Sequence, residues 1–336
     1  GYGCIKSGAQ ALVAQLSESM NIPVTTSLKG KGIISEQNHL SLGSLGVTSS
    51  GQAYQYIVDE ADLVMFLGAG FNERTSYLWD DKLLDQKRVI QVDNDPGQLE
   101  KVFDADLAIK ADISLVLSQL LDRLESMDAA AKDWQAPAST GARFAVNGKN
   151  PTHTSFRLVE NFFSRLEQRF PEGIQVFDDN IIFAQNFFRV SRGNRYYPNS
   201  GVSSLGHAVP AAIGASFYAD KPSFAVLGDG GFQMCCMEIM TAVNYQKPLN
   251  IVLFNNSTMG LIRKNQFQQY QQRFIDCDFV NPDYQYLAKS FGINHCRIET
   301  EPDIHAVFEN NDLENEINLI ETVIDKDAFP SYVSGR

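Results

Sequence analysis

The sequence of 336 residues lacks the cysteine patterns that hold metal ions or disulfide frameworks. It contains five cysteines, an odd number, and no CxxC pair. Neither a zinc knuckle nor a disulfide scaffold is therefore predicted, and a reducing compartment is favoured. No apolar run approaches the ~20 residues that a membrane-spanning helix needs, and no signal-peptide pattern opens the chain. We expect a cytoplasmic protein that does not insert into a membrane.

Positive charge is also scarce. The 28 basic residues are outnumbered by 40 acidic ones, which gives a net charge of −12. This balance argues against nucleic acid or an anionic membrane as a partner. Hydrophobic residues make up 44% of the chain, which is enough for packed cores, and the length predicts about two domains.

What the chain does contain is an alternation of strand-like and helix-like segments. Apolar strands such as ADLVMFLGAGF alternate with amphipathic helices such as ISLVLSQLLDRLESM. This pattern predicts an α/β fold with two three-layer α/β/α domains, whose mainly parallel sheets are covered by helices on both faces.

The boundaries of these domains follow from changes in composition. Residues 1–125 are predicted to form a Rossmann-like central domain and residues 151–336 a second domain. Residues 126–150 have little periodicity and are predicted to be a linker. The Gly-Tyr-Gly turn at the start normally follows a strand, so we expect the first domain to lack its first strand and the chain to be a fragment.

The stretch GDGGFQMCCMEIMTAVNYQKPLNIVLFNNSTMG, residues 228–260, contains the strongest chemical signal. A strand delivers the glycines at its carboxyl end, where open α/β sheets bind ligands, and a helix start favours a phosphate there. Asp229 beside a phosphate requires a cation between them. Asn255 and Asn256 follow the next strand and should emerge at the same sheet edge. Such oxygen ligands suit Mg²⁺, so the stretch predicts a Mg–diphosphate site.

The spacing of this stretch makes the prediction specific. GDG is followed by 24 residues and then by two asparagines, and this resembles the cofactor signature of thiamine diphosphate enzymes. The alternative is an ordinary βαβ unit with an Asn-capped turn. Residues 1–125 resemble the central domain of the acetolactate synthase and pyruvate oxidase group, a DHS-like fold, in segments such as SGAQALVAQLSESMNIPVTTSLKGKG, LSLGSLGV and VIQVDNDP.

Residues 151–336 resemble the diphosphate-binding domain of that family, where SGVSSLGHAVPAAIGAS is similar to the loop and helix that hold the aminopyrimidine. The resemblance implies three metal ligands: Asp229, the side chain of Asn256 and the backbone carbonyl of Thr258. It implies a group of residues that contact the cofactor: Ser203, Leu205, Gly228, Gly230, Gly231, Met259, Gly260 and Asn180. Leu205 would bend the cofactor so that it removes its own C2 proton. Asp178 and Asp179 are expected near the diphosphate.

The same resemblance implies that part of the catalytic site lies elsewhere. In this family a glutamate of an N-terminal pyrimidine-binding domain drives cofactor activation, so no catalytic residue is assigned here and the fragment is expected to be inactive alone. That domain would come from the full-length chain or a separate subunit, in a homodimer or homotetramer. Asn265 replaces a Trp of the biosynthetic enzymes. FAD stays open, because Gly70 and Thr48 stand where an Arg and a His help hold it, whereas Arg74 remains.

The sequence thus predicts thiamine diphosphate-dependent decarboxylation of a 2-oxo acid with transfer to an acceptor, as in acetolactate synthases, by a transferase or lyase. The alternative is a non-catalytic nucleotide-binding α/β module. Two local expectations complete the prediction. Met234, Met237 and Met240 are expected to fill the apolar core side of their helix, and the segment QFQQYQQRF, residues 266–274, is expected to be mobile over the site.

Overall fold

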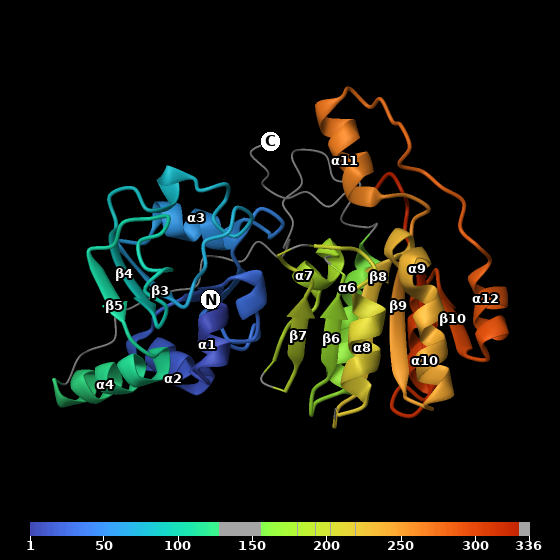
Figure 1. Cartoon of the computed structure of the whole chain (residues 1–336), viewed down its shortest axis with the longest axis horizontal. Coiled ribbons are helices and arrows are strands. Elements are labelled where there is room, and N and C mark those ends of the chain that lie inside the picture. Colours follow the sequence, from blue (N-terminus) through green and yellow to red (C-terminus); the bar gives the residue numbers. More distant parts are fainter. Residues whose placement is uncertain (128–155, 180, 192, 202, 219, 329–336) are drawn as a thin grey trace. The chain divides into compact units, whose positions relative to one another are not determined.

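The computed structural model describes residues 1–127, 156–179, 181–191, 193–201, 203–218 and 220–328. In this part of the chain all pairings between named strands are parallel, which confirms the predicted α/β class. The described residues fall into two compact units (Figure 1), 1–127 with 189–191 and 156–188 with 193–328. Apart from residues 126 and 127 the predicted linker lies outside the described residues, so the domain boundaries stay a prediction.

The first unit contains two small parallel sheets. Their strands are β1 (Val24–Thr26) paired with β2 (Ser41–Ser44), and β3 (Leu63–Leu67), β4 (Arg88–Asp93) and β5 (Leu107–Lys110) in that order. Its helices are α1 (Tyr2–Lys6), α2 (Gln10–Met20), α3 (Gln52–Asp59) and α4 (Ile113–Ser126), with short 3₁₀ turns at Leu28–Gly30 and Asp81–Leu83. Leucines at helical spacing bury one face of α4, and Asp112 caps its first turn through the N–H groups of Ser114 and Leu115.

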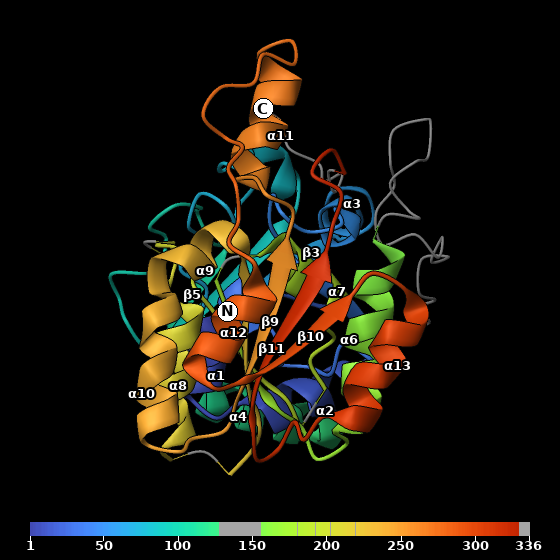
Figure 2. The same cartoon turned by 90° about the vertical axis from the view of Figure 1, so that its right-hand side faces the viewer.

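The second unit is built on a six-stranded parallel sheet in the order β10-β11-β9-β8-β6-β7. Its strands are β6 (Gln175–Asp178), β7 (Arg195–Pro198), β8 (Ser223–Gly228), β9 (Leu249–Asn255), β10 (Asn294–Ile298) and β11 (Ile317–Val323). Its helices are α6 (Arg157–Arg169), α7 (Ile182–Phe187), α8 (Ala208–Ser216), α9 (Asp229–Cys235), α10 (Ile239–Asn244), α11 (Gly260–Gln269), α12 (Tyr284–Phe291) and α13 (Glu301–Asn310), with a 3₁₀ turn at Cys236–Glu238. Figure 2 shows α8, α10 and α12 on one face of the sheet, and α6 and α13 on the other.

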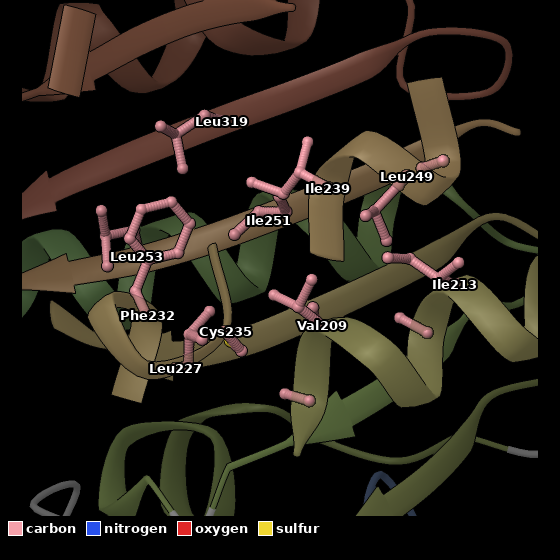
Figure 3. Close-up of a cluster of buried hydrophobic side chains, with 14 of the residues drawn as sticks. Val209, Ile213, Leu227, Phe232, Cys235, Ile239, Leu249, Ile251, Leu253 and Leu319 are labelled. Atoms are coloured by element: carbon pink, nitrogen blue, oxygen red, sulfur yellow. The ribbon is translucent and has the colours of Figure 1, made fainter. Parts of the chain in front are cut away.

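The core of this unit lies between the sheet and the layer of α8, α9, α10 and α12. Apolar residues of the inner strands meet the buried faces of the helices (Figure 3), and the cluster includes Val209, Ile213, Leu227, Phe232, Ile239, Leu249, Ile251 and Leu253. The inner strands are continuous apolar runs because both faces of the sheet are covered. Among the described helices none is long and apolar enough to span a bilayer.

The expectation for the methionines is wrong for two of them. Met234 and Met237 are 64% and 67% exposed, whereas Met240 is partly buried against the core. The buried face of this segment is formed instead by Phe232, Cys235, Ile239 and Ala242. The spacing of three and four residues between these positions defines a single helical face, and the two methionines lie off it.

The first half of the Gln-rich segment is helical, and its mobility stays a prediction. Helix α11 runs to Gln269 and is seen extending away from the sheet in Figure 1. After Tyr270 the chain turns sharply, because Gln271 and Gln272 both have left-handed backbones, with φ of 54° and 61°. Left-handed φ is strained for a residue with a Cβ atom.

Because of this strain, substitution by glycine is expected to have opposite effects on stability at two exposed glutamines. Gln272→Gly is expected to stabilise the protein by about 0.5–1 kcal/mol, because glycine adopts a positive φ without the steric penalty but loses more chain entropy. Gln268→Gly, in the interior of α11, is expected to destabilise it by about 1 kcal/mol. Urea denaturation of both variants measures the difference, and equal effects would contradict the assigned turn.

Candidate functional site

The carboxyl ends of β8 and β9 bring the two parts of the GDG and NN signature together. The strands pair in parallel with Gly228 opposite Phe254. Asp229, the next residue after β8, therefore lies beside the chain that leaves β9. Its Oδ2 atom accepts hydrogen bonds from the backbone N–H of Asn256 at 3.1 Å and of Ser257 at 2.6 Å. The adjacency that the sequence predicted is confirmed.

The two oxygens of Asp229 have different surroundings. Besides the two backbone donors, Oδ2 accepts a hydrogen bond from Nδ2 of Asn281 at 2.8 Å. Oδ1 accepts one from the backbone N–H of Gly230, at 2.9 Å. Because a carboxylate oxygen offers about two lone pairs, Oδ2 is saturated and Oδ1 keeps capacity for a further ligand.

Burial makes the charge of Asp229 costly. The residue is 1% exposed, and burial raises the pKa of its carboxyl, although the hydrogen bonds from Asn281, Ser257 and Gly230 act in the opposite direction. A bound cation would offset this cost, since an opposite charge favours the ionised carboxylate.

The loop that follows β9 is held by a second segment of the chain. Thr258 is buried and its hydroxyl donates to the carbonyl of Cys277 at 2.8 Å. The N–H of Met259 donates to the same carbonyl at 2.8 Å, and the N–H of Phe279 donates to the carbonyl of Ser257 at 3.1 Å. Residues 256–260 therefore have a defined backbone, which is required of a loop that supplies both a side-chain and a main-chain ligand.

Arg263 anchors the base of α11 to this arrangement. Its guanidinium group, on a 6% exposed residue, donates through Nη1 to both oxygens of Asp278 at 3.0 and 2.8 Å and through Nη2 to Asp327 at 2.6 Å. It also lies 3.9 Å from the centroid of the Phe274 ring. One buried cation thus joins α11 to two carboxylates that come from different segments.

Three glycines allow the segments around Asp229 to pack closely against one another. A Cβ atom on Gly230 would lie 2.5 Å from Sδ of Met259, one on Gly231 2.5 Å from Oδ2 of Asp179, and one on Gly260 3.1 Å from Nδ2 of Asn256. Glycine at these positions lets the two loops approach each other. Helix α9 begins at Asp229 and helix α11 begins at Gly260. The free N–H groups at the start of a helix favour the binding of an anion.

The loop predicted to meet the aminopyrimidine lies against the same region. Gly206 has a φ of +84°, and a Cβ atom there would lie 3.7 Å from the carbonyl oxygen of Gly231. Ser203 also has a positive φ of 57°, and Leu205 is 36% exposed. Asn180 lies outside the described residues, so its contact stays a prediction.

Asp178 is the last residue of β6, the strand next to β8, and Asp179 follows it, and both carboxylates have partners within the protein. Asp179 is fully buried and accepts hydrogen bonds from the backbone N–H of Gly206 at 2.7 Å and of His207 at 2.9 Å. Asp178 is fully buried and binds the Tyr196 hydroxyl and, at 2.7 Å, the N–H of Ile181. Asp179 thereby fixes the Ser203–Leu205 loop, a role that the sequence did not reveal because the contact spans 27 residues.

The donor set suits a hard cation. The set predicted from the sequence, one carboxylate oxygen of Asp229, the amide oxygen of Asn256 and the carbonyl of Thr258, consists of oxygens of the kind that Mg²⁺ binds together with phosphate oxygens, and it stays a prediction. No cluster of three or more His, Cys, Asp or Glu side chains that could hold a metal occurs among the described residues. A site of this type would need phosphate oxygens to complete its coordination.

Comparison with known families agrees with this arrangement. Residues 1–120 match the family model described as "Thiamine pyrophosphate enzyme, central domain", and residues 180–321 match "Thiamine pyrophosphate enzyme, C-terminal TPP binding domain". The chain belongs to the family of thiamine pyrophosphate (thiamine diphosphate) enzymes.

Several curated proteins are similar over most of the chain. The acetolactate synthase large subunit of Cyanidium caldarium is 32% identical over 92% of the chain and 54% of the relative. A probable acetolactate synthase large subunit of Methanococcus aeolicus is 27% identical over 99% of the chain and 58% of the relative. The acetolactate synthase large subunit of Lactococcus lactis is 28% identical over 97% and 57%. The chain therefore spans about half the length of the curated relatives it matches.

Proposed function

We propose that the chain forms the metal–diphosphate half of a thiamine diphosphate site that decarboxylates a 2-oxo acid and transfers the product to an acceptor, as acetolactate synthases do. The observation on which the proposal rests is the convergence of Asp229 and the Asn256–Thr258 loop at the ends of β8 and β9. The names of the relatives support the reaction class.

In the proposed site Asp229, Asn256 and the Thr258 carbonyl hold Mg²⁺. Residues 228, 230, 231, 259 and 260 line the diphosphate, and Ser203 and Leu205 meet the aminopyrimidine. When bound, thiamine diphosphate supplies the carbon nucleophile and the electron sink for loss of CO₂. The protein groups bind and orient the diphosphate, and the glycines admit it close to the backbone.

The remainder of the site is proposed to come from elsewhere. A glutamate of a pyrimidine-binding domain, in the full-length protein or a separate subunit, would complete it within a homodimer or homotetramer, and a 2-oxo acid is the proposed substrate. A cytoplasmic location and the absence of nucleic-acid and membrane partners stay predictions. The family descriptions name thiamine pyrophosphate and give no support for FAD, which is not part of the proposal.

The proposal is tested by binding rather than by turnover, because the diphosphate half can be probed by itself. Isothermal titration calorimetry with inorganic pyrophosphate and with thiamine diphosphate should show binding in the presence of Mg²⁺ and its loss when EDTA is added. ADP serves as the competitor. Tighter binding of ADP than of thiamine diphosphate would favour a nucleotide-binding module and contradict the proposal.

A further inference from the structure

Asn281 is not among the site residues predicted from the sequence, yet its side chain contacts Asp229 directly. We propose that Asn281 is a positioning residue that, together with the backbone N–H groups of Asn256 and Ser257, fixes which oxygen of Asp229 faces the metal ion. The inference rests on the proposed function, since it concerns the same metal site.

The orientation of the Asn281 amide follows from its neighbours. An ionised carboxylate accepts hydrogen bonds only, so the atom that lies 2.8 Å from Oδ2 of Asp229 must be the amide nitrogen. The amide oxygen then accepts from Nε2 of Gln233 at 2.7 Å. The nitrogen also lies 2.8 Å from Oδ1 of Asn255, so the amide is held from three sides.

The backbone of Asn281 is held as well. Two residues earlier, Phe279 donates its N–H to Ser257. Two residues later, Asp283 caps α12 by accepting the N–H groups of Gln285 and Tyr286 at 3.0 and 3.1 Å. The chain on both sides of Asn281 is therefore held by hydrogen bonds, and this fixes the position of the amide group that donates to Asp229.

Asn255, which shares the Asn281 amide, is itself anchored in the sheet. Its Nδ2 donates to Oε1 of Glu321 at 2.6 Å, and Glu321, 1% exposed, is bound by His295 at 3.0 Å and Arg297 at 2.7 Å. Asn255 therefore presents its oxygen, not its nitrogen, to Asn281. A continuous set of hydrogen bonds connects β11 to the carboxylate of Asp229.

This arrangement matters because the carboxylate of an aspartate rotates easily. Its terminal torsion is broad, and only directed donors select one orientation. With Oδ2 bound by Asn281, Asn256 and Ser257, Oδ1 is the oxygen that remains for a cation. Mg²⁺ demands a near-ideal octahedral geometry, whereas Ca²⁺ accepts irregular ones, so the orientation of Asp229 should matter more for Mg²⁺.

The test compares metal affinities of the chain at a saturating concentration of thiamine diphosphate. Asn281→Ala is expected to weaken Mg²⁺ binding by about 10–100-fold, the usual effect of removing a partner of a metal ligand, and to weaken Ca²⁺ binding less. Circular dichroism and thermal denaturation without ligand establish that the fold is retained. Asn315→Ala is the matched control, because it removes an amide that donates to another carboxylate, that of Asp312, and it should leave both affinities unchanged.

Asn281→Leu keeps the approximate size of the side chain and secures the test if the alanine variant unfolds. It removes the donor without adding a charge, so the same loss of Mg²⁺ affinity as in the alanine variant is expected. Wild-type Mg²⁺ affinity in Asn281→Leu, or an equal loss of Mg²⁺ and Ca²⁺ affinity in Asn281→Ala, would overturn the positioning role. Wild-type affinity in Asn281→Ala would overturn it while leaving the proposed function intact, whereas a wild-type chain that binds no thiamine diphosphate with Mg²⁺ would overturn both.

Discussion

Replacement of Asp229 by asparagine is expected to weaken the binding of Mg²⁺ and thiamine diphosphate by on the order of 100-fold or more. Loss of a partner of a metal ligand alone costs about 10–100-fold, and this change removes the charge of the ligand itself. The carboxylate is also the group that offsets the divalent cation within a buried site. Calorimetric titration of Mg²⁺ at a fixed concentration of thiamine diphosphate measures the effect.

The fold of Asp229→Asn is expected to persist. An amide oxygen can accept the hydrogen bonds that Oδ2 receives from Asn256, Ser257 and Asn281. Burial raises the pKa of Asp229, so the neutral side chain also removes a costly charge from the metal-free protein. Glu238→Gln is the matched control, because it neutralises an exposed carboxylate nine residues further along. Equal affinities in Asp229→Asn and the wild type would refute the assigned metal ligand.

Replacement of Asp178 by asparagine should remove a large part of the pH dependence of stability. Burial raises the pKa of Asp178 to about 7, against the hydrogen bonds from Tyr196, Ile181 and Gln185, which lower it. In the unfolded chain the group titrates near its ordinary value of 3.8. Between these two values the folded protein holds a proton that the unfolded chain has released.

The sign of the effect follows from this difference in bound protons. The contribution of Asp178 is fully present below about pH 4 and is lost as the pH rises to about 7, with a slope on the order of 1 kcal/mol per pH unit. The amide of the Asp178→Asn variant cannot titrate, yet its oxygen can accept from Ile181 and its nitrogen can donate to the Tyr196 hydroxyl. The variant should therefore gain stability relative to the wild type as the pH increases, by a few kcal/mol at pH 8.

Urea denaturation of both proteins at pH 5, 6, 7 and 8 measures this relative gain. Asp303→Asn provides the comparison, because hydrogen bonds from the backbone of Glu299 and from Thr300 hold the pKa of this exposed carboxyl below its ordinary value. Its effect should consequently be constant over the same pH range. A difference between the wild type and Asp178→Asn that does not change from pH 5 to pH 8 would show that Asp178 is not protonated in the folded state.

The sequence predicted those parts of the site that are joined by a short stretch of chain with regular secondary structure. Asp229 and Asn256 are separated by helices α9 and α10 and by strand β9, and a parallel crossover of this kind places both strand ends at one sheet edge. The glycines were predictable because close approach of the backbone is tolerated only without a Cβ atom. Local periodicity and composition were therefore sufficient to predict that Asp229 and Asn256 lie close together.

The partners of these residues could not be predicted in this way. Asn281 contacts Asp229 across 52 residues, and no spacing rule connects a loop before α12 with the end of β8. Asp179 was expected near the diphosphate, which stays a prediction, but the hydrogen bonds of its carboxylate with Gly206 and His207 could not be predicted from the sequence. The exposure of Met234 and Met237 likewise depends on which face of the helix meets the sheet, and apolar composition does not distinguish between the faces.

The amino-acid sequence by itself determined the α/β class and the proximity of a GDG turn to two asparagines, because these depend on short-range periodicity and chain connectivity. Only the tertiary structure decided which oxygen of Asp229 remains for a ligand, which acids are fully buried, and which amide contacts Asp229. Those properties arise from hydrogen bonds and desolvation between segments that are remote in sequence, and such contacts exist only after the sheet and its covering helices have packed.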